Sequence, residues 1–306
     1  MVRVVTVEAE RQEKRASPGP LVAQGADFVT QVPPSVRAEW GLIGEVERLD
    51  GGQGTSVRVG PIVLKPQSDE VLVAWQAQLC HRISATGFRL PPPVPARDGR
   101  LVVDGWSATT HVDGQPVPED DPSANSWLPV LAASRAFHTA LADEPRPPFL
   151  DRRDDRWARA DRIAWHEADA DDVGPHSREL LAGIGGLVHD EGLPRQLVHG
   201  DLSGNVLLAD RTAPAIIDIS PYWRPAAYAD AVVVVDALLW WSADPALVQL
   251  SQPTTLTSAQ WRSLLTRALL FRLFAFDEPR RDVRDTNDQL PRYAAVLGHL
   301  RSDVMR

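Results

Sequence analysis

Residues 197–220 read LVHGDLSGNVLLADRTAPAIIDIS, two short apolar runs separated by a polar turn. The runs occupy 206–208 and 215–217, with the turn at 209–212. Such a pattern is typical of a β-hairpin. Asp201 precedes the first run and Asp218 follows the second, so we expect the hairpin to bring both carboxylates to one edge, beside Asn205.

Two carboxylates and an amide at one edge form an oxygen-rich set of candidate ligands. Hard oxygen ligands of this kind suit Mg²⁺. The central stretch therefore predicts a magnesium site.

A second set of motifs lies upstream. Residues 42–49 predict a strand, and two further strands follow at 57–59 and 62–64, the last ending on Lys65. The turn after the first strand contains Gly51, Gly52 and Gly54. Glycine allows a backbone to approach phosphate closely. Lys65 is informative because Lys14 is the only other lysine in the chain.

The order of these motifs resembles the aminoglycoside and choline phosphotransferase branch of the kinase-like phosphotransferases. The resemblance is carried by His199-Gly200-Asp201-Leu202, by Asn205 and by the apolar-apolar-Asp ending at Asp218, and it extends over 42–239. Gly200 stands where protein kinases carry Arg. The resemblance implies an α+β, bilobal protein-kinase-like fold, with a small antiparallel-sheet N-lobe and a larger, mainly helical C-lobe.

This fold implies a domain organisation. Residues 29–113 would form the N-lobe and 114–306 the C-lobe, with a hinge at 110–116 whose backbone binds adenine in the family. Residues 1–28 are polar, contain two prolines and show no periodicity, so we expect a tail or a loosely packed extension.

The resemblance also implies roles for individual residues. Asp201 would accept or orient the proton of the attacking hydroxyl, and Asn205 and Asp218 would hold Mg²⁺ that bridges the phosphates. Lys65 and the glycine-rich turn would hold ATP or GTP. His199 is expected to shape the catalytic loop.

Three features depart from the family pattern. Asn205 follows Asp201 by four residues rather than five, a difference that Gly204 can absorb; Ser203 or a water is the alternative ligand. The family's helix in this place carries a Glu that pairs with the lysine. In the predicted helix 69–83 the only acid after its first residue is Glu70, which either pairs with Lys65 or favours the helix N-terminus through the dipole. An acid of the N-terminal tail, or Glu45, is the other candidate partner of Lys65.

The third departure follows the metal aspartate, where Ile219-Ser220-Pro221 replaces Phe-Gly. This replacement argues against an activation loop of the protein-kinase type.

The C-terminal half predicts mainly helices, at 127–141, 257–276 and 287–300. His138 reads as a packed helix histidine, and 257–260 resembles a capping box. Asp236 lies in an apolar run, so it needs buried partners, and the resemblance suggests that it braces the catalytic loop.

Two segments leave alternatives open. Residues 151–166 mix acids, arginines and two tryptophans, which indicates either an ion-paired solvated helix face or a substrate wall. Residues 221–225 either line an acceptor pocket or pack as a rigid aromatic loop.

Composition narrows the choice of partners. The chain has 306 residues, a net charge of −9 and a pI of about 5.4. Its acidity argues against nucleic acids and anionic membranes. It suits a cationic small substrate, although many acidic proteins are merely soluble.

Cys80 is the only cysteine, which excludes an internal disulfide and cysteine-based zinc sites. The start of the chain lacks an apolar leader, so we expect a cytoplasmic protein.

The sequence thus predicts an ATP- (or GTP-) and Mg²⁺-dependent kinase acting on a hydroxyl of a small molecule, with an amino sugar or amino alcohol as the family-weighted acceptor. The alternative is a nucleotide-binding pseudokinase that regulates partners. A metal hydrolase fits less well because no His/Asp cluster supplies ligands for two metals.

Overall fold

The computed structural model describes residues 32–49, 55–67, 69–169, 175–184, 186–189, 192–277 and 289–302. The predicted tail 1–28 and the turn glycines Gly51, Gly52 and Gly54 lie outside these residues.

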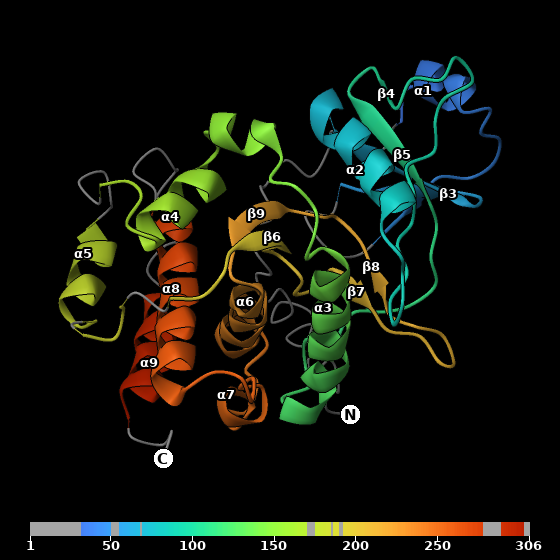
Figure 1. Ribbon diagram of the computed structural model, residues 1–306. Helices are drawn as coiled ribbons and strands as arrows, with labels where there is room; N and C mark the ends of the chain where they lie inside the picture. Colours follow the sequence, from blue (N-terminus) through green and yellow to red (C-terminus); the bar gives the residue numbers. More distant parts are fainter. Residues whose placement is uncertain are drawn as a thin grey trace, which may run out of the picture.

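The small lobe consists of a five-stranded antiparallel sheet and two helices. Its elements are α1 (Pro34–Glu39), β1 (Glu47–Arg48), β2 (Val57–Val59), β3 (Ile62–Pro66), α2 (Glu70–Arg82), β4 (Val102–Val103) and β5 (Trp106–Thr110). The strand order is β1-β2-β3-β5-β4, and Lys65 pairs with Ser107 in the register of β3 with β5. Figure 1 shows this lobe at the upper right, with α2 beside the sheet.

Most of the predicted small-lobe elements are present. The strand predicted at 42–49 is reduced to β1, because Gly41 and Gly44 adopt positive φ angles of 64° and 128° and interrupt the extended chain. The predicted helix 69–83 is confirmed as α2. Its N-cap is Asp69, whose side chain accepts from the backbone N–H of Leu72 at 2.9 Å.

The large lobe is mainly helical. Its elements are η1 (Ala124–Trp127), α3 (Leu128–Ala140), η2 (Pro148–Arg152), α4 (Arg156–Ala164), α5 (Pro175–Ala182), β6 (Gln196–His199), β7 (Val206–Leu207), β8 (Ala215–Ile216), β9 (Pro221–Arg224), α6 (Ala226–Trp240), α7 (Leu247–Leu250), α8 (Ser258–Phe276) and α9 (Leu290–Arg301). The capping box is confirmed at Thr257 and Gln260, where α8 begins. No helix within the described ranges is long and apolar enough to cross a bilayer.

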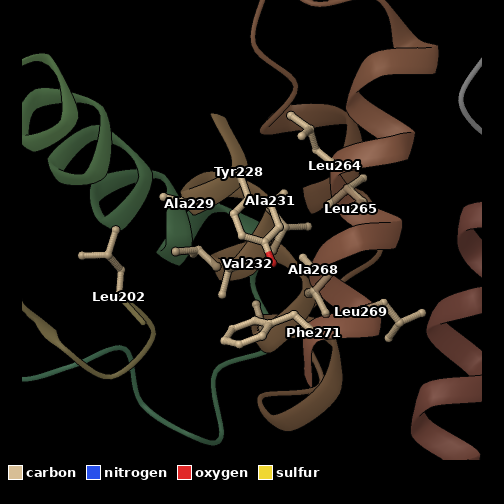
Figure 2. Packing of buried hydrophobic residues seen from close by; sticks show 14 of the residues in the cluster. Leu202, Tyr228, Ala229, Ala231, Val232, Leu264, Leu265, Ala268, Leu269 and Phe271 are labelled. Carbon is tan, nitrogen blue, oxygen red and sulfur yellow. The ribbon is translucent and has the colours of Figure 1, made fainter. Parts of the chain in front are cut away.

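The core of the large lobe is centred on α6 and α8. Every residue of α6 from Tyr228 to Ala237 is buried, and α8 is buried from Ser263 onward. A helix that is apolar all round packs on every side. Figure 2 shows Ala231 and Val232 of α6 packed near Ala268 and Phe271 of α8.

The backbone of the predicted hinge segment, 110–116, is bonded to the central hairpin of the large lobe. Gln115 and Leu208 exchange two N–H···O hydrogen bonds of 2.8 Å, which join the hinge to the end of β7. Gly114 has a φ of +140°, and a Cβ at this position would lie 2.9 Å from the Leu207 Cβ. Only glycine allows this close approach of hinge and hairpin.

Candidate functional site

The predicted hairpin is confirmed, and it brings the expected site residues together. β7 and β8 pair antiparallel, with Val206 opposite Ile216. Two further backbone bonds extend the pairing: Ile217 donates to the Asn205 carbonyl at 3.0 Å, and Gly200 donates to the Ser220 carbonyl at 2.9 Å. Asp201, Asn205 and Asp218 are flanked by these bonds and therefore share one edge.

Lys65 reaches this edge from the small lobe. Its Nζ lies 2.8 Å from Oδ1 of Asp218, and both side chains are about one-third exposed. Asp218 holds a φ of +52°, an unusual backbone conformation that Asp tolerates better than most residues. The residue expected to bind nucleotide phosphates and the residue expected to bind Mg²⁺ are thus paired with each other.

Glu70 does not pair with Lys65 in the structure. It is the first residue of α2 and is exposed, while Lys65 pairs with Asp218. The position at the start of α2 accords with the helix-dipole alternative.

Gln76 supplies a contact between α2 and the segment that follows Asp218, which the sequence did not reveal. Its Nε2 donates to the Ile219 carbonyl at 3.0 Å, one residue after Asp218. A glutamine on a helix carries no distinctive pattern, so no sequence signal identifies this role.

Asn205 meets Asp201 despite the short spacing. Gly204 takes a φ of +77°, which turns the chain between them. Asn205 is buried, and its Nδ2 donates to the Asp201 backbone carbonyl at 2.7 Å. Because the amide nitrogen is engaged there, the amide oxygen of Asn205 is left to act as a metal ligand.

The chemistry of these donors fits magnesium. The Asp218 carboxylate and the Asn205 amide oxygen are hard ligands, and Mg²⁺ usually takes only one or two protein oxygens beside substrate phosphates and water. Within the described residues no group of three His, Cys, Asp or Glu side chains gathers to hold a metal ion.

His199 positions the backbone on both sides of the hairpin. Its Nδ1 accepts from the N–H groups of Asp201 at 3.1 Å and Ser220 at 3.4 Å, while Nε2 donates to the Ile217 carbonyl at 3.1 Å. Burial lowers the pKa of His199, so the neutral ring is favoured. His199 therefore shapes the loop, as expected.

His138 is packed inside α3, as predicted, and it also supports the catalytic loop. Its Nε2 accepts from the His199 backbone N–H at 3.0 Å, so its own proton lies on Nδ1 and donates to Ser134 Oγ at 3.2 Å. Ser134 in turn donates to Asp230 at 2.6 Å. Burial lowers the pKa of His138 to about 3.

Asp236 is buried and paired, as its apolar surroundings required. Arg272 of α8 donates to its two carboxylate oxygens at 2.7 and 2.6 Å, and the same guanidinium donates to Asp201 Oδ1 at 2.7 Å. Burial raises the pKa of Asp236 to about 6, although Arg272 opposes this shift. Arg272 was not among the predicted site residues, because α8 contains other arginines and no local pattern distinguishes this one.

A cavity of about 200 Å³ lies between α4 and β9. Tyr222 and Trp223 line it, so segment 221–225 borders a pocket and packs inward; it forms β9, paired with β6, rather than the rigid loop that was one of the two alternatives. Tyr222 contacts the core at Phe271, and its ring lies 2.5 Å from where a Cβ on Gly200 would be. The cavity wall therefore adjoins the residue before Asp201.

Segment 151–166 forms part of this wall and carries ion pairs. Asp161 is buried and receives two hydrogen bonds from Arg224, at 3.1 and 2.6 Å. Arg224 also pairs with Glu167 at 2.8 Å. The segment is thus not merely a solvated face, because its inner side borders the cavity.

No family model matches the sequence, and no curated protein matches it. Solved structures do. Spectinomycin phosphotransferase APH(9)-Ia, in complex with ADP and spectinomycin, has a TM-score of 0.55 and 13% identity over 87% of this chain and 95% of that chain. An aminoglycoside phosphotransferase from Alicyclobacillus acidocaldarius has a TM-score of 0.56 and 15% identity over 90% of this chain and 95% of its own.

A thermostable mutant of aminoglycoside phosphotransferase APH(4)-Ia, in a ternary complex with ADP and hygromycin B, has a TM-score of 0.55 and 15% identity over 87% of this chain and 97% of its own. These matches confirm the predicted fold: a bilobal, protein-kinase-like fold of the aminoglycoside phosphotransferase type.

Proposed function

We propose that this chain, which shares the fold of the aminoglycoside phosphotransferases, is an ATP- (or GTP-) and Mg²⁺-dependent kinase that phosphorylates a hydroxyl of a small molecule. The observation that carries the proposal is the convergence of Lys65, Asp201, Asn205 and Asp218. These residues come from both lobes, and each type matches a separate requirement of phosphoryl transfer.

Each residue has a defined task in the proposed reaction. Asp201 orients the acceptor hydroxyl and takes its proton as the new O–P bond forms. Lys65 leaves Asp218 and neutralises the charge of the nucleotide phosphates. The Asp218 carboxylate is then free to hold Mg²⁺ together with the amide oxygen of Asn205. When bound, Mg²⁺ supplies charge neutralisation at the phosphates.

The acceptor we propose is an amino sugar or amino alcohol. The cavity beside Tyr222 is lined by arginines and by the acids Asp151, Asp161 and Glu167, which favours a polar ligand over an apolar one. Asp151 and Glu167 are paired with Arg146 and Arg195, so an ammonium group of the acceptor would take the place of an arginine at these carboxylates. Localisation in the cytoplasm is part of the same proposal.

The second candidate is a pseudokinase that binds nucleotide but does not transfer phosphate. Two observations favour it: Asn205 is displaced by one residue from the family spacing, and Lys65 pairs with Asp218 rather than with a helix glutamate. Both candidates require nucleotide binding, and only the first requires Asp201.

The first experiment measures thermal unfolding with ATP, GTP and ADP, each with and without Mg²⁺. A ligand at ~100 times its dissociation constant stabilises the folded state by about 2.7 kcal/mol. We expect a Mg²⁺-dependent rise in Tm that Asp218→Ala abolishes. Asp210→Ala, which removes an exposed acid from the tip of the same hairpin, should retain the rise. No Tm shift with any nucleotide would overturn both candidates.

The second experiment measures ADP release from Mg²⁺–ATP with a panel of amino sugars and amino alcohols. In a kinase, Asp201→Asn should bind nucleotide normally but lower kcat by ~10²–10⁴-fold, the usual contribution of a general base. A protein that binds Mg²⁺–ATP, releases no ADP with any acceptor and is unchanged by Asp201→Asn is the pseudokinase.

A further inference from the structure

Arg272 is a buried cation placed between two carboxylates. Its side chain is 2% exposed and lies on α8, facing α6 and the catalytic loop. Nε and Nη2 donate to the two oxygens of Asp236, and Nη2 also donates to Oδ1 of Asp201 at 2.7 Å. One guanidinium therefore links an acid of the helical core to the acid expected to accept the hydroxyl proton.

The surroundings keep this guanidinium charged and fixed. Burial alone would lower the pKa of Arg272, but Asp236 and Asp201 raise it. The rings of Trp157, Trp240 and Phe271 lie 5.4, 5.5 and 4.9 Å from the guanidinium carbon. Aromatic faces attract a cation and exclude water. A planar guanidinium with several donors in fixed directions then determines where each carboxylate lies.

The two oxygens of Asp201 differ in their partners. Oδ1 accepts the short bond from Arg272. Among the described residues, the contact of Oδ2 is with Asn205 Nδ2, at a long 3.4 Å. The Asp201 side chain is 34% exposed, whereas that of Asp236 is 1% exposed. Oδ2 is therefore the oxygen left to meet an acceptor.

We propose that Arg272 is a positioning residue that holds Oδ1 of Asp201 so that Oδ2 accepts the proton of the acceptor hydroxyl. This inference rests on the proposed kinase function. The acceptor O–H bond breaks and its proton passes to Oδ2, while the acceptor oxygen bonds to the γ-phosphorus. The bond from that phosphorus to the bridging oxygen breaks, and its electron pair leaves with ADP.

A purely structural role for Arg272 predicts something different. The pair with Asp236 alone would join α8 to α6, and losing it would lower stability without a specific effect on turnover. The bond to Asp201 has a distinct consequence: its loss should lower kcat, leave KM for Mg²⁺–ATP unchanged and have no effect once Asp201 is neutralised.

The test compares Arg272→Lys with Arg267→Lys. Arg267 is a matched control because it is a second buried arginine of α8. It lies over the Trp165 ring and donates to the backbone carbonyls of Ala164 and His189. Lysine keeps the positive charge in both variants but cannot reproduce the fixed fork of donors. ADP release is measured with water as acceptor and with each acceptor found in the panel.

We expect Arg272→Lys to lower kcat by ~10- to 100-fold, since misplacement of a reacting group by about 1 Å costs this much. Arg267→Lys should change kcat less than twofold. In an Asp201→Asn background, Arg272→Lys should have no further effect on kcat.

Equal kcat in Arg272→Lys and wild type overturns the positioning role and leaves the kinase function standing. An undiminished effect of Arg272→Lys in the Asp201→Asn background also overturns it. A wild type that releases no ADP overturns the kinase function, and the positioning role with it. If Arg272→Lys does not fold, the double variant Arg272→Met/Asp236→Leu replaces the buried ion pair with apolar side chains of similar volume. Asp201 then lacks its donor, so a kcat equal to that of wild type contradicts the role.

Discussion

His138 is a buried neutral base whose hydrogen bonds determine its protonation state. Its Nε2 must accept from the His199 N–H, so a second proton would break this bond to the end of β6, the strand that leads to Asp201. Burial lowers the pKa of His138 to about 3, well below the value of about 6.5 for an unfolded histidine. Between these values the unfolded chain binds more protons, so stability falls as pH falls.

We therefore expect the free energy of unfolding to decrease as pH falls below about 6.5, with His138 contributing a slope of up to about 1.36 kcal/mol per pH unit. His138→Gln keeps an acceptor without a titrating group, so its pH slope should be smaller than that of wild type. The measurement is urea unfolding between pH 7.5 and 4.5. His81→Gln, an exposed control on α2, should leave the slope unchanged. Equal slopes for all three proteins would contradict this prediction.

Gly204 explains how a shortened spacing can still present Asn205. With a φ of +77° it turns the chain between Asp201 and Asn205, and a Cβ there would meet only Trp241, at 4.0 Å. A side chain has room, so any cost arises from the backbone, about 1–2 kcal/mol for a left-handed L-residue.

We expect Gly204→Ala to lose about this stability and to weaken Mg²⁺-dependent nucleotide binding, because Asn205 shifts. Gly105→Ala is a matched control: it has the same φ of +77°, open space around its Cβ and a position in the turn between β4 and β5. Chemical unfolding and nucleotide titration of both variants provide the measurement. We expect both variants to lose a similar amount of stability, and only Gly204→Ala to bind nucleotide more weakly than wild type. Equal nucleotide affinities of the two variants would show that the position of Asn205 does not depend on this turn.

At the scale of elements, α2 connects the small lobe to the segment of the large lobe that follows Asp218. The connection is Gln76, which donates to the Ile219 carbonyl beside Asp218. The family pairs Lys with a helix Glu, whereas here a neutral side chain holds the loop backbone and Lys65 pairs with Asp218. The helix thus contacts the backbone next to Asp218, the residue that we propose holds Mg²⁺.

Gln76→Ala should remove a hydrogen bond of about 0.5–1.5 kcal/mol. We expect a smaller Mg²⁺–ATP-induced rise in Tm than in wild type, because Asp218 is less firmly placed. Gln78→Ala, on the exposed face of the same helix, removes an identical side chain without this bond and should behave as wild type. Indistinguishable Tm shifts in the two variants would rule out the connection.

At the scale of the whole molecule, the two lobes differ in the size of their cores. The small-lobe cluster consists of Val32, Val36, Val57, Val59, Leu64 and Ala108, whereas the large-lobe cluster includes most of α6 and α8. Leu202, which follows Asp201 in the chain and is labelled in Figure 2, is a buried member of this larger cluster. Local opening is expected where few apolar side chains are buried.

Hydrogen exchange should therefore be slowest in α6 and α8 and faster in β2 and β3. Mg²⁺–ATP should slow exchange in β3 and in the β7–β8 hairpin together, since the proposed ligands come from both. Mass spectrometry of exchanged peptides measures this. Protection confined to the small lobe would contradict the proposed participation of Asn205 and Asp218.

Much of the fold and part of the site could be predicted from local patterns. The hairpin, Asp201, Asn205 and Asp218 follow from two apolar runs and their flanking residues, and Lys65 follows from its place at the end of a strand. Helix boundaries such as that of α8 follow from the capping box. These features depend on neighbours in sequence, so the sequence alone determined them.

The remaining features depend on residues that meet only after folding. Arg272 lies 71 residues from Asp201, Gln76 lies 143 from Ile219, and His138 lies 61 from His199. No local pattern signals such partners, because a buried polar group is satisfied by whichever group packing brings within hydrogen-bond distance. For the same reason the sequence did not determine which acid pairs with Lys65: folding brings Asp218, and not Glu70, within reach of its ammonium group. The sequence by itself determined which chemical groups the site contains, and only the tertiary structure decided how they are held.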